Sequence, residues 1–135
     1  MRRLMATTRR AAAVTLLAAA TVAAGAGVAS AGNAGSGSCN ASKGTLWCGN
    51  EGRAALYRSP GFGTPDKPMP TVDRLYTTYS WFSCWTTGDR HSGGNTTWYR
   101  TKGDVNGRWG FVPASNLYTY ASFDKDKTKP GLERC

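Results

Sequence analysis

The stretch Trp98 to Leu117, WYRTKGDVNGRWGFVPASNL, predicts a β-hairpin followed by a short turn. Aromatic and β-branched residues concentrate in 97–102 and 108–112, which we therefore expect to be strands. The residues between them, GDVNG, end in Asn-Gly, a pair that tolerates the positive φ of a tight hairpin. Pro113 is expected to end the second strand because it has no N–H to donate. Ala114–Asn116 is predicted to form one 3₁₀ turn.

This pattern resembles the second half of an SH3-like barrel, of the kind found in small secreted bacterial proteins. In that family a Trp-containing strand precedes a Gly-aromatic-aliphatic-Pro run, as GFVPASNL does at 110–117. Upstream, Ala55-Leu56-Tyr57 is similar to the opening of the fold. The resemblance covers residues 53–120. It implies an all-β domain, a small SH3-like barrel of five to six short antiparallel strands.

The same resemblance implies a ligand-binding groove. It places Trp98, Pro113 and Asn116 in the groove, with Tyr57 across from them. Asn116 departs from the eukaryotic branch of the family, which usually has Tyr there and recognises Pro-rich peptides. The place of Trp109 is left open. Three apolar residues of the second strand and its turn are expected in the core: Phe111, Val112 and Leu117.

Residues 1–31 are predicted to be a cleaved secretory signal peptide. Four arginines precede an Ala-rich apolar run over 11–24, and Ala29-Ser30-Ala31 matches the A-x-A cleavage pattern. The run is shorter than the about 20 apolar residues that span a bilayer, so a signal anchor is the less favoured alternative. A Gly- and Ser-rich linker over 32–38 follows, and the rest of the chain is long enough for one small domain.

Loss of the signal peptide changes the charge of the protein. That segment holds four of the 17 Lys and Arg residues and none of the eight Asp and Glu residues, so the remainder is about +5 rather than +9. A mildly basic secreted protein favours anionic surfaces such as teichoic acids or acidic sugars. Nucleic acid is not an expected partner, because no Lys/Arg block or basic helix is present. Near the C-terminus, three lysines alternate with two aspartates over 124–129, which predicts a solvated tail.

The four cysteines of the chain fit the disulfides that small secreted domains use to reinforce a limited core. Three connectivities are possible. We favour Cys39–Cys48, which closes a small loop, and Cys84–Cys135, which ties the C-terminal tail to a central strand. Zinc is the alternative, but the sequence has no C-x-x-C pair. We expect no metal and no other cofactor.

Two further extended segments are predicted ahead of the hairpin, at 53–57 and 72–75. The Pro- and Gly-rich residues 59–70 lie between them and exclude a helix. They occupy the place of the long first loop of an SH3-like barrel, which forms one wall of the groove in many relatives. Phe62 and Met69 are either groove contacts or loop residues packed on the core.

The segment SWFSCWT, residues 80–86, is predicted to be one continuous strand. Its side chains alternate between two faces: Trp81, Ser83 and Trp85 on one, and Phe82, Cys84 and Thr86 on the other. Because a bonded cysteine and a Phe belong in the core, Trp81 and Trp85 are expected to face outward, where they can stack on a ligand. In the alternative, the tail covers both rings through Phe123 or Leu132.

The Gly-rich loop over 87–96 contains the only histidine. His91, oriented by Asp89, would be the general base of a hydrolase. No activated nucleophile, G-x-S-x-G, H-E-x-x-H or phosphate-binding Gly-rich loop accompanies it. We therefore expect no catalytic residues and no enzymatic activity. A hydrolase whose turnover is lost in His91→Ala is kept as an alternative.

Five Trp and six Tyr exceed what the core of so small a domain can bury, since each buried ring needs a partner for its N–H or O–H. We therefore predict a secreted, extracellular or cell-wall-associated monomer with no membrane partner once the signal peptide is removed. Its expected ligand is peptidoglycan or its peptide stems, bound in an aromatic groove. The alternative is a secreted protein-binding inhibitor or toxin-like effector without affinity for the wall.

The chain is thus expected to comprise a disulfide-bonded extension over 39–52, a barrel over 53–120 and a tail over 121–135 tethered by Cys135. The predicted ligand-binding residues are Tyr57, Trp98, Pro113, Asn116, Trp81 and Trp85.

Overall fold

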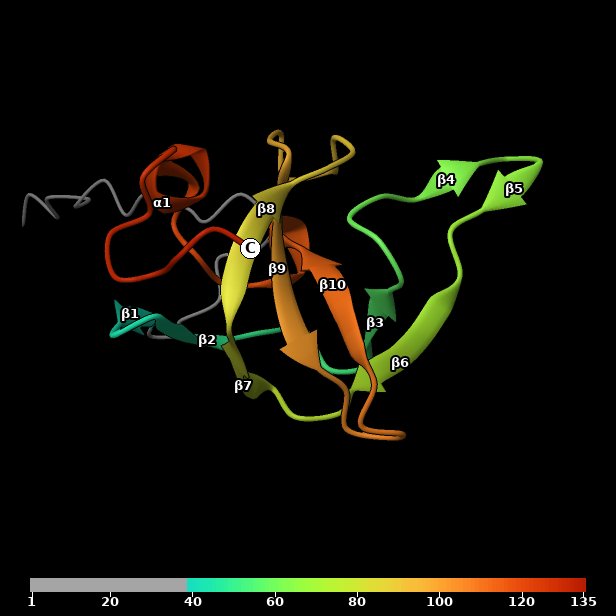
Figure 1. Ribbon diagram of the computed structural model, residues 1–135, viewed down its shortest axis with the longest axis horizontal. Coiled ribbons are helices and arrows are strands. Elements are labelled where there is room, and N and C mark those ends of the chain that lie inside the picture. The colour runs from blue at the N-terminus through green and yellow to red at the C-terminus, as the bar shows by residue number, and fades with distance from the viewer. Residues whose placement is uncertain (1–38) are drawn as a thin grey trace, which may run out of the picture.

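The computed structural model describes residues 39–135, so the predicted signal peptide (1–31) and linker (32–38) lie outside the described residues. The described part consists mainly of β-strands, with one short α-helix and one 3₁₀ helix (Figure 1). Within this part, no helix is long and apolar enough to cross a membrane.

The predicted hairpin is confirmed. Its strands, β9 (Thr97–Lys102) and β10 (Trp109–Pro113), pair in antiparallel fashion over five residues. Three backbone N–H groups of the turn donate to the carboxylate of Asp73 at 2.9–3.2 Å, from Val105, Asn106 and Arg108. The 3₁₀ turn is confirmed as η1 (Ala114–Asn116). A buried carboxylate from a distant strand therefore fixes the hairpin turn.

The hairpin belongs to a five-stranded antiparallel sheet with the order β6-β3-β10-β9-β8. The remaining strands are β3 (Ala54–Tyr57), β6 (Thr71–Leu75) and β8 (Cys84–Thr87). The bounds of β3 and β6 agree within one residue with the predicted segments 53–57 and 72–75.

Two smaller sheets complete the described part. One contains β1 (Asn40–Ser42), β2 (Thr45–Gly49) and β7 (Tyr79–Phe82) in that order. The other is a two-residue ladder of β4 (Gly63–Thr64) and β5 (Lys67–Pro68), a small arm at the upper right of Figure 1 within the predicted loop.

The expectation of one barrel with five to six strands is therefore corrected. Ten strands form three sheets in the described part, and none of these sheets closes on itself. The reason is that β7 pairs with β2 of the N-terminal extension, whereas β8 pairs with β9. The expected all-β class holds, but the strand arrangement is open.

The expected continuous strand over 80–86 is also wrong, because the chain breaks at Ser83 between β7 and β8. The N–H of Ser83 donates to the carbonyl of Arg100 at 2.8 Å, and the next residue, Cys84, is itself the register partner of Arg100. Two residues thus oppose one, as in a β-bulge, and one extra residue reverses the alternation of side chains. Trp85 consequently points into the core and is 4% exposed.

The hydrophobic core lies between the two larger sheets and under η1. It confirms two of the three expected core residues, Val112 and Leu117, whereas Phe111 is only half-buried. Phe111 is the register partner of Tyr57 on one side and Arg100 on the other, so it lies on the outer face of the sheet. The larger side chains of the core cluster are Leu46, Leu56, Leu75, Phe82, Trp85, Tyr99, Val112, Leu117 and Leu132, and Trp98 is buried outside this cluster.

Both expected disulfides, Cys39–Cys48 and Cys84–Cys135, are confirmed. Cys84 lies on the edge strand β8, not on a central strand as expected. The tail lies beside that edge: Trp85 N–H donates to the Glu133 carbonyl at 3.1 Å, and Cys135 N–H donates to the Trp85 carbonyl at 2.8 Å (Figure 1). The tail therefore covers an edge that would otherwise present unpaired backbone groups.

The tail is not solvated as expected, because two of its alternating charges are buried. After the short helix α1 (Ala121–Lys125), the ammonium of Lys129 donates to three backbone carbonyls at 2.6–3.0 Å, those of Phe123, Asp124 and Asp126. Asp124 accepts from Tyr99 Oη at 2.6 Å and from Thr119 Oγ1 at 2.9 Å. Burial raises the pKa of Asp124 and lowers the pKa of Lys129 to about 8. The charged pattern thus forms a buried polar network.

Candidate binding surface

A row of aromatic side chains crosses the boundary between the two larger sheets. It begins on the three-stranded sheet, where Trp47 of β2 and Trp81 of β7 are register partners. Tyr79 lies two residues before Trp81 on β7, and its ring stacks on Trp47 with centroids 5.9 Å apart and an interplanar angle of 19°. Cross-strand geometry thus places three rings on one face.

The row continues onto the five-stranded sheet through Trp109 at the start of β10. Its ring meets Trp81 edge-to-face at a centroid distance of 5.5 Å. The guanidinium carbon of Arg100 lies 4.7 Å from the centroid of Trp109, which is cation–π geometry. We call Tyr79, Trp47, Trp81 and Trp109, with Arg100 at one end, the aromatic belt.

The belt is open to solvent although two pairs of its rings, Tyr79 with Trp47 and Trp81 with Trp109, pack on each other. Tyr79 is 48% exposed, Trp47 46% and Trp109 43%, while Trp81 is half-buried between them. The neighbours of Trp47 explain its position, since Leu46 and Cys48 are buried and alternation turns Trp47 outward. Contiguous exposed rings are typical of contact surfaces, so this face is the candidate binding surface.

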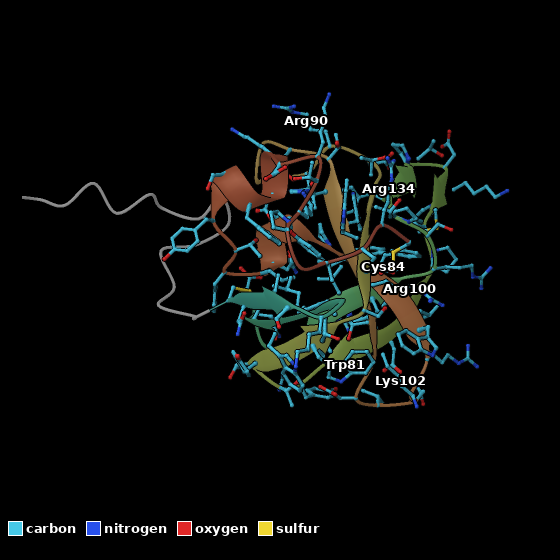
Figure 2. The ribbon with its side chains drawn as sticks, turned by 60° about the vertical axis from the view of Figure 1, so that its left-hand side comes forward. Trp81, Cys84, Arg90, Arg100, Lys102 and Arg134 are labelled. Atoms are coloured by element: carbon cyan, nitrogen blue, oxygen red, sulfur yellow. A yellow bond between two sulfur atoms is a disulfide. The ribbon has the colours of Figure 1, made fainter. Side chains whose placement is uncertain are left out.

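Cations border the belt. Lys102 is the register partner of Trp109 and is exposed, and Arg100 lies two residues before Lys102 on β9. Figure 2 shows Trp81 and Lys102 toward the lower end of the molecule, with Arg100 above them. The surface therefore combines flat apolar rings with indole N–H, phenol and cationic donors, a combination that binds planar or ring-shaped polar ligands.

The residues of the expected groove lie in a separate cluster. Tyr57 and Trp98 are brought together with centroids 5.7 Å apart, as expected. Phe62 packs on both, at 5.4 Å from Tyr57 and 5.0 Å from Trp98. Trp98 is fully buried and donates its indole N–H to the Asp89 carbonyl at 2.9 Å. Trp98, which was expected to line the groove, therefore has no surface open to a ligand in this structure, and its role as a binding residue stays a prediction.

Pro113 is buried opposite Trp98, and Asn116 is half-buried. Asn116 accepts at its backbone carbonyl from Glu51 N–H at 2.9 Å. Phe62 packs on Trp98 and remains 38% exposed, so its packing on the interior is confirmed while its role as a groove contact stays a prediction. Ligand binding by Tyr57 and Asn116 stays a prediction, because both retain solvent access.

Trp81 and Trp85 lie in different environments, although they were expected on one face. Trp81 belongs to the aromatic belt, and Trp85 is in the core under the tail. Lys129 Nζ lies 4.3 Å from the Trp85 ring centroid, the guanidinium of Arg134 lies 5.2 Å from it, and Leu132 joins the same core cluster. The alternative that the tail covers the rings is thus correct for Trp85, whose expected outward placement is wrong.

Sequence reasoning missed Trp47 and Tyr79 and left Trp109 open. A signal for the first two was present, because a half-cystine and a Leu flank Trp47 and because Tyr79 and Trp81 have the spacing of one strand face. The contact between Trp81 and Trp109 had no such signal. It joins strands of different sheets.

His91 does not pair with the carboxylate of Asp89. Gly93 N–H donates to His91 Nδ1 at 3.1 Å, so Nε2 carries the proton and donates to the Thr97 carbonyl at 2.9 Å. Burial lowers the pKa of His91, which keeps the ring neutral. The Asp89 carboxylate instead accepts from Phe62 N–H at 2.9 Å. These bonds give His91 a role in shaping its loop.

The cysteines cannot be zinc ligands, since all four form disulfides. Among residues 39–135, no three His, Cys, Asp or Glu side chains gather as metal ligands would. Comparison of the chain with family models, curated proteins and solved structures yields no match.

Proposed function

We propose that this protein is a secreted, non-catalytic binding domain for a cell-wall polymer, peptidoglycan or its peptide stems, and that the aromatic belt is its contact surface. The observation that carries the proposal is a row of four rings, two stacked or edge-to-face pairs joined by the register partners Trp47 and Trp81, with three of the rings nearly half exposed. Such a row offers successive flat apolar faces along an extended ligand. The two disulfides fit the oxidising, extracellular environment in which a wall polymer is found.

Charge supports the same class of ligand. The chain after the predicted signal peptide is about +5, and Arg100 and Lys102 border the rings. An anionic polymer is attracted to such a surface, although salt screens this part of the interaction. Stacking of the ligand on the rings is expected to provide the part of the binding free energy that persists in salt.

The test is co-sedimentation of the protein with purified sacculi over a salt series. Trp109→Ala and Trp47→Ala each remove one ring of the belt, and we expect each to weaken retention about tenfold, the effect of about 1.4 kcal/mol. Tyr120→Ala is the matched control, since Tyr120 is 58% exposed and lies outside the belt. Circular dichroism of each variant verifies that it is folded.

Binding that persists in salt and falls only in the belt variants would support the proposal. Binding that is lost in salt and is unchanged by both Trp substitutions would show that the interaction is charge attraction alone. Failure of the folded protein to sediment with sacculi would reject the wall ligand.

A protein partner is the second candidate function, as expected for an inhibitor or toxin-like effector. The observation that favours it is the composition of the belt, since Trp, Tyr and Arg dominate the energetic centres of protein interfaces. The same variants separate the two functions, because a protein whose belt binds another protein would stay in the supernatant when sacculi are pelleted, with or without Trp109.

A further inference from the structure

A concave site lies away from the aromatic belt and shares no residue with it. It is a hollow of about 450 Å³ between the loop after β8, the end of α1 and the C-terminal tail. Figure 2 shows Arg90, which lines the hollow, at the upper end of the molecule, with Trp81 of the belt toward the lower end.

Positive charge dominates the lining of this hollow. Four side chains contribute cations from three separate segments: Arg90, Lys125, Lys127 and Arg134. Lys129 also lines it, but its ammonium is taken up by three backbone carbonyls. Within residues 39–135, the side chains of Arg90, Lys125 and Lys127 make no ion pair or hydrogen bond. Cations gathered without an anion favour an anionic ligand.

The two carboxylates of the lining, Asp124 and Asp126, already have partners. Both oxygens of Asp124 accept hydrogen bonds inside the protein, from Tyr99 and Thr119. Asp126 accepts from Thr128 N–H at 2.8 Å and from Thr128 Oγ1 at 2.7 Å. Five cations against two acids leave an excess of three positive charges at the hollow.

The walls are held in place by interactions that do not use the free cations. Arg134 lies over the Trp85 ring at 5.2 Å and donates to Thr87 Oγ1 at 3.3 Å, next to the Cys84–Cys135 disulfide. Lys129 ties together the backbone of residues 123–126, and so holds the segment that carries Lys125 and Lys127. A pre-ordered site loses less conformational entropy on binding.

We propose that this hollow, the basic pocket, binds a phosphate group, as a phosphodiester of an anionic polymer or as free phosphate. Arginines offer paired N–H donors that match phosphate oxygens, while lysines act as point charges around the same group. Hydroxyl groups of Thr87 and Thr96 add neutral donors to the lining. The proposal does not depend on the function proposed for the belt, because the two sites have no residue in common.

Isothermal titration with inorganic pyrophosphate tests the site, with a glycerol phosphate polymer as the phosphodiester probe. We expect Arg90→Gln and Lys127→Gln each to weaken pyrophosphate binding about tenfold, the loss of one charge-assisted contact. Lys43→Gln and Lys67→Gln are matched controls that remove the same charge from exposed positions outside the pocket. They are expected to change the affinity less than twofold. Polygalacturonate serves as a carboxylate polymer for comparison.

Selective loss in Arg90→Gln and Lys127→Gln, with preference for phosphate over polygalacturonate, would support the proposal. An equal loss of affinity in Lys67→Gln would show that only the net charge of the protein matters. Absence of pyrophosphate binding to the unsubstituted protein would overturn the proposed site. Trp109→Ala must leave pyrophosphate binding unchanged, so failure of the basic pocket and failure of the belt are separate results.

Discussion

The two disulfides are expected to differ in their contributions to stability, and the difference follows from the loops they close. Cys84–Cys135 joins residues 51 apart, whereas Cys39–Cys48 joins residues nine apart. In the chain-entropy model the longer loop restricts the unfolded chain by about 4 kcal/mol and the shorter one by about 2.5 kcal/mol. We therefore expect the double substitution Cys84→Ala with Cys135→Ala to be the more damaging of the two.

Packing favours the opposite order of destabilisation, so the comparison is a demanding test of the loop-length argument. Cys48 is fully buried, whereas Cys135 is exposed, so replacing the shorter disulfide leaves the larger cavity. Urea unfolding followed by Trp fluorescence measures both double variants against the unsubstituted protein, without reductant. The slope of the free energy against urea should also rise more in the variant lacking Cys84–Cys135, because its unfolded state is less restricted.

The two pairs also have different consequences for binding. Loss of Cys84–Cys135 releases the anchor beside Arg134, so pyrophosphate binding should weaken while retention by sacculi persists in the folded fraction. The reasoning fails if the Cys39–Cys48 variant is destabilised as much as, or more than, the Cys84–Cys135 variant. Equal pyrophosphate affinity in both double variants would show that the disulfide does not hold the basic pocket.

Two buried charges yield further predictions. Although burial raises the pKa of Asp73, hydrogen bonds from the backbone N–H groups of Arg108, Arg74, Asn106 and Val105 lower it overall. The contribution of Asp73 to stability should be present at pH 7 and be lost as the pH falls below about 4. In urea unfolding, Asp73→Asn should therefore lower the free energy of unfolding by about 1–3 kcal/mol at pH 7 and by little at pH 2.5. An equal loss at both pH values would contradict this. Burial lowers the pKa of Lys129 to about 8, so the unfolded chain holds this proton more tightly and stability should rise from pH 8 toward pH 10. Lys129→Met should abolish that rise in thermal melts, and a rise that persists would assign it to another group.

Local features of the sequence were sufficient to predict the hairpin, the η1 turn and both disulfides. Strand periodicity, Asn-Gly and the imino acid Pro113 act within a few residues, so they predict the hairpin without reference to distant partners, although the Asp73 carboxylate that holds its turn comes from a distant strand. The disulfides followed from an oxidising environment and the short loop between Cys39 and Cys48. For the belt, the residues around Trp47 and Tyr79 carried a signal through simple alternation.

The tertiary structure alone decided which aromatic rings and which charges are exposed. One extra residue at Ser83 reverses the strand alternation, so Trp85 enters the core while Trp81 stays in the belt. The tail resembles a solvated run of charges, yet Lys129 lies against the ring of Trp85 and Asp124 accepts a hydrogen bond from Tyr99. Both outcomes depend on contacts between segments far apart along the chain. Composition and periodicity describe only near neighbours, so a charged residue gives no local sign of whether a distant strand will bury it.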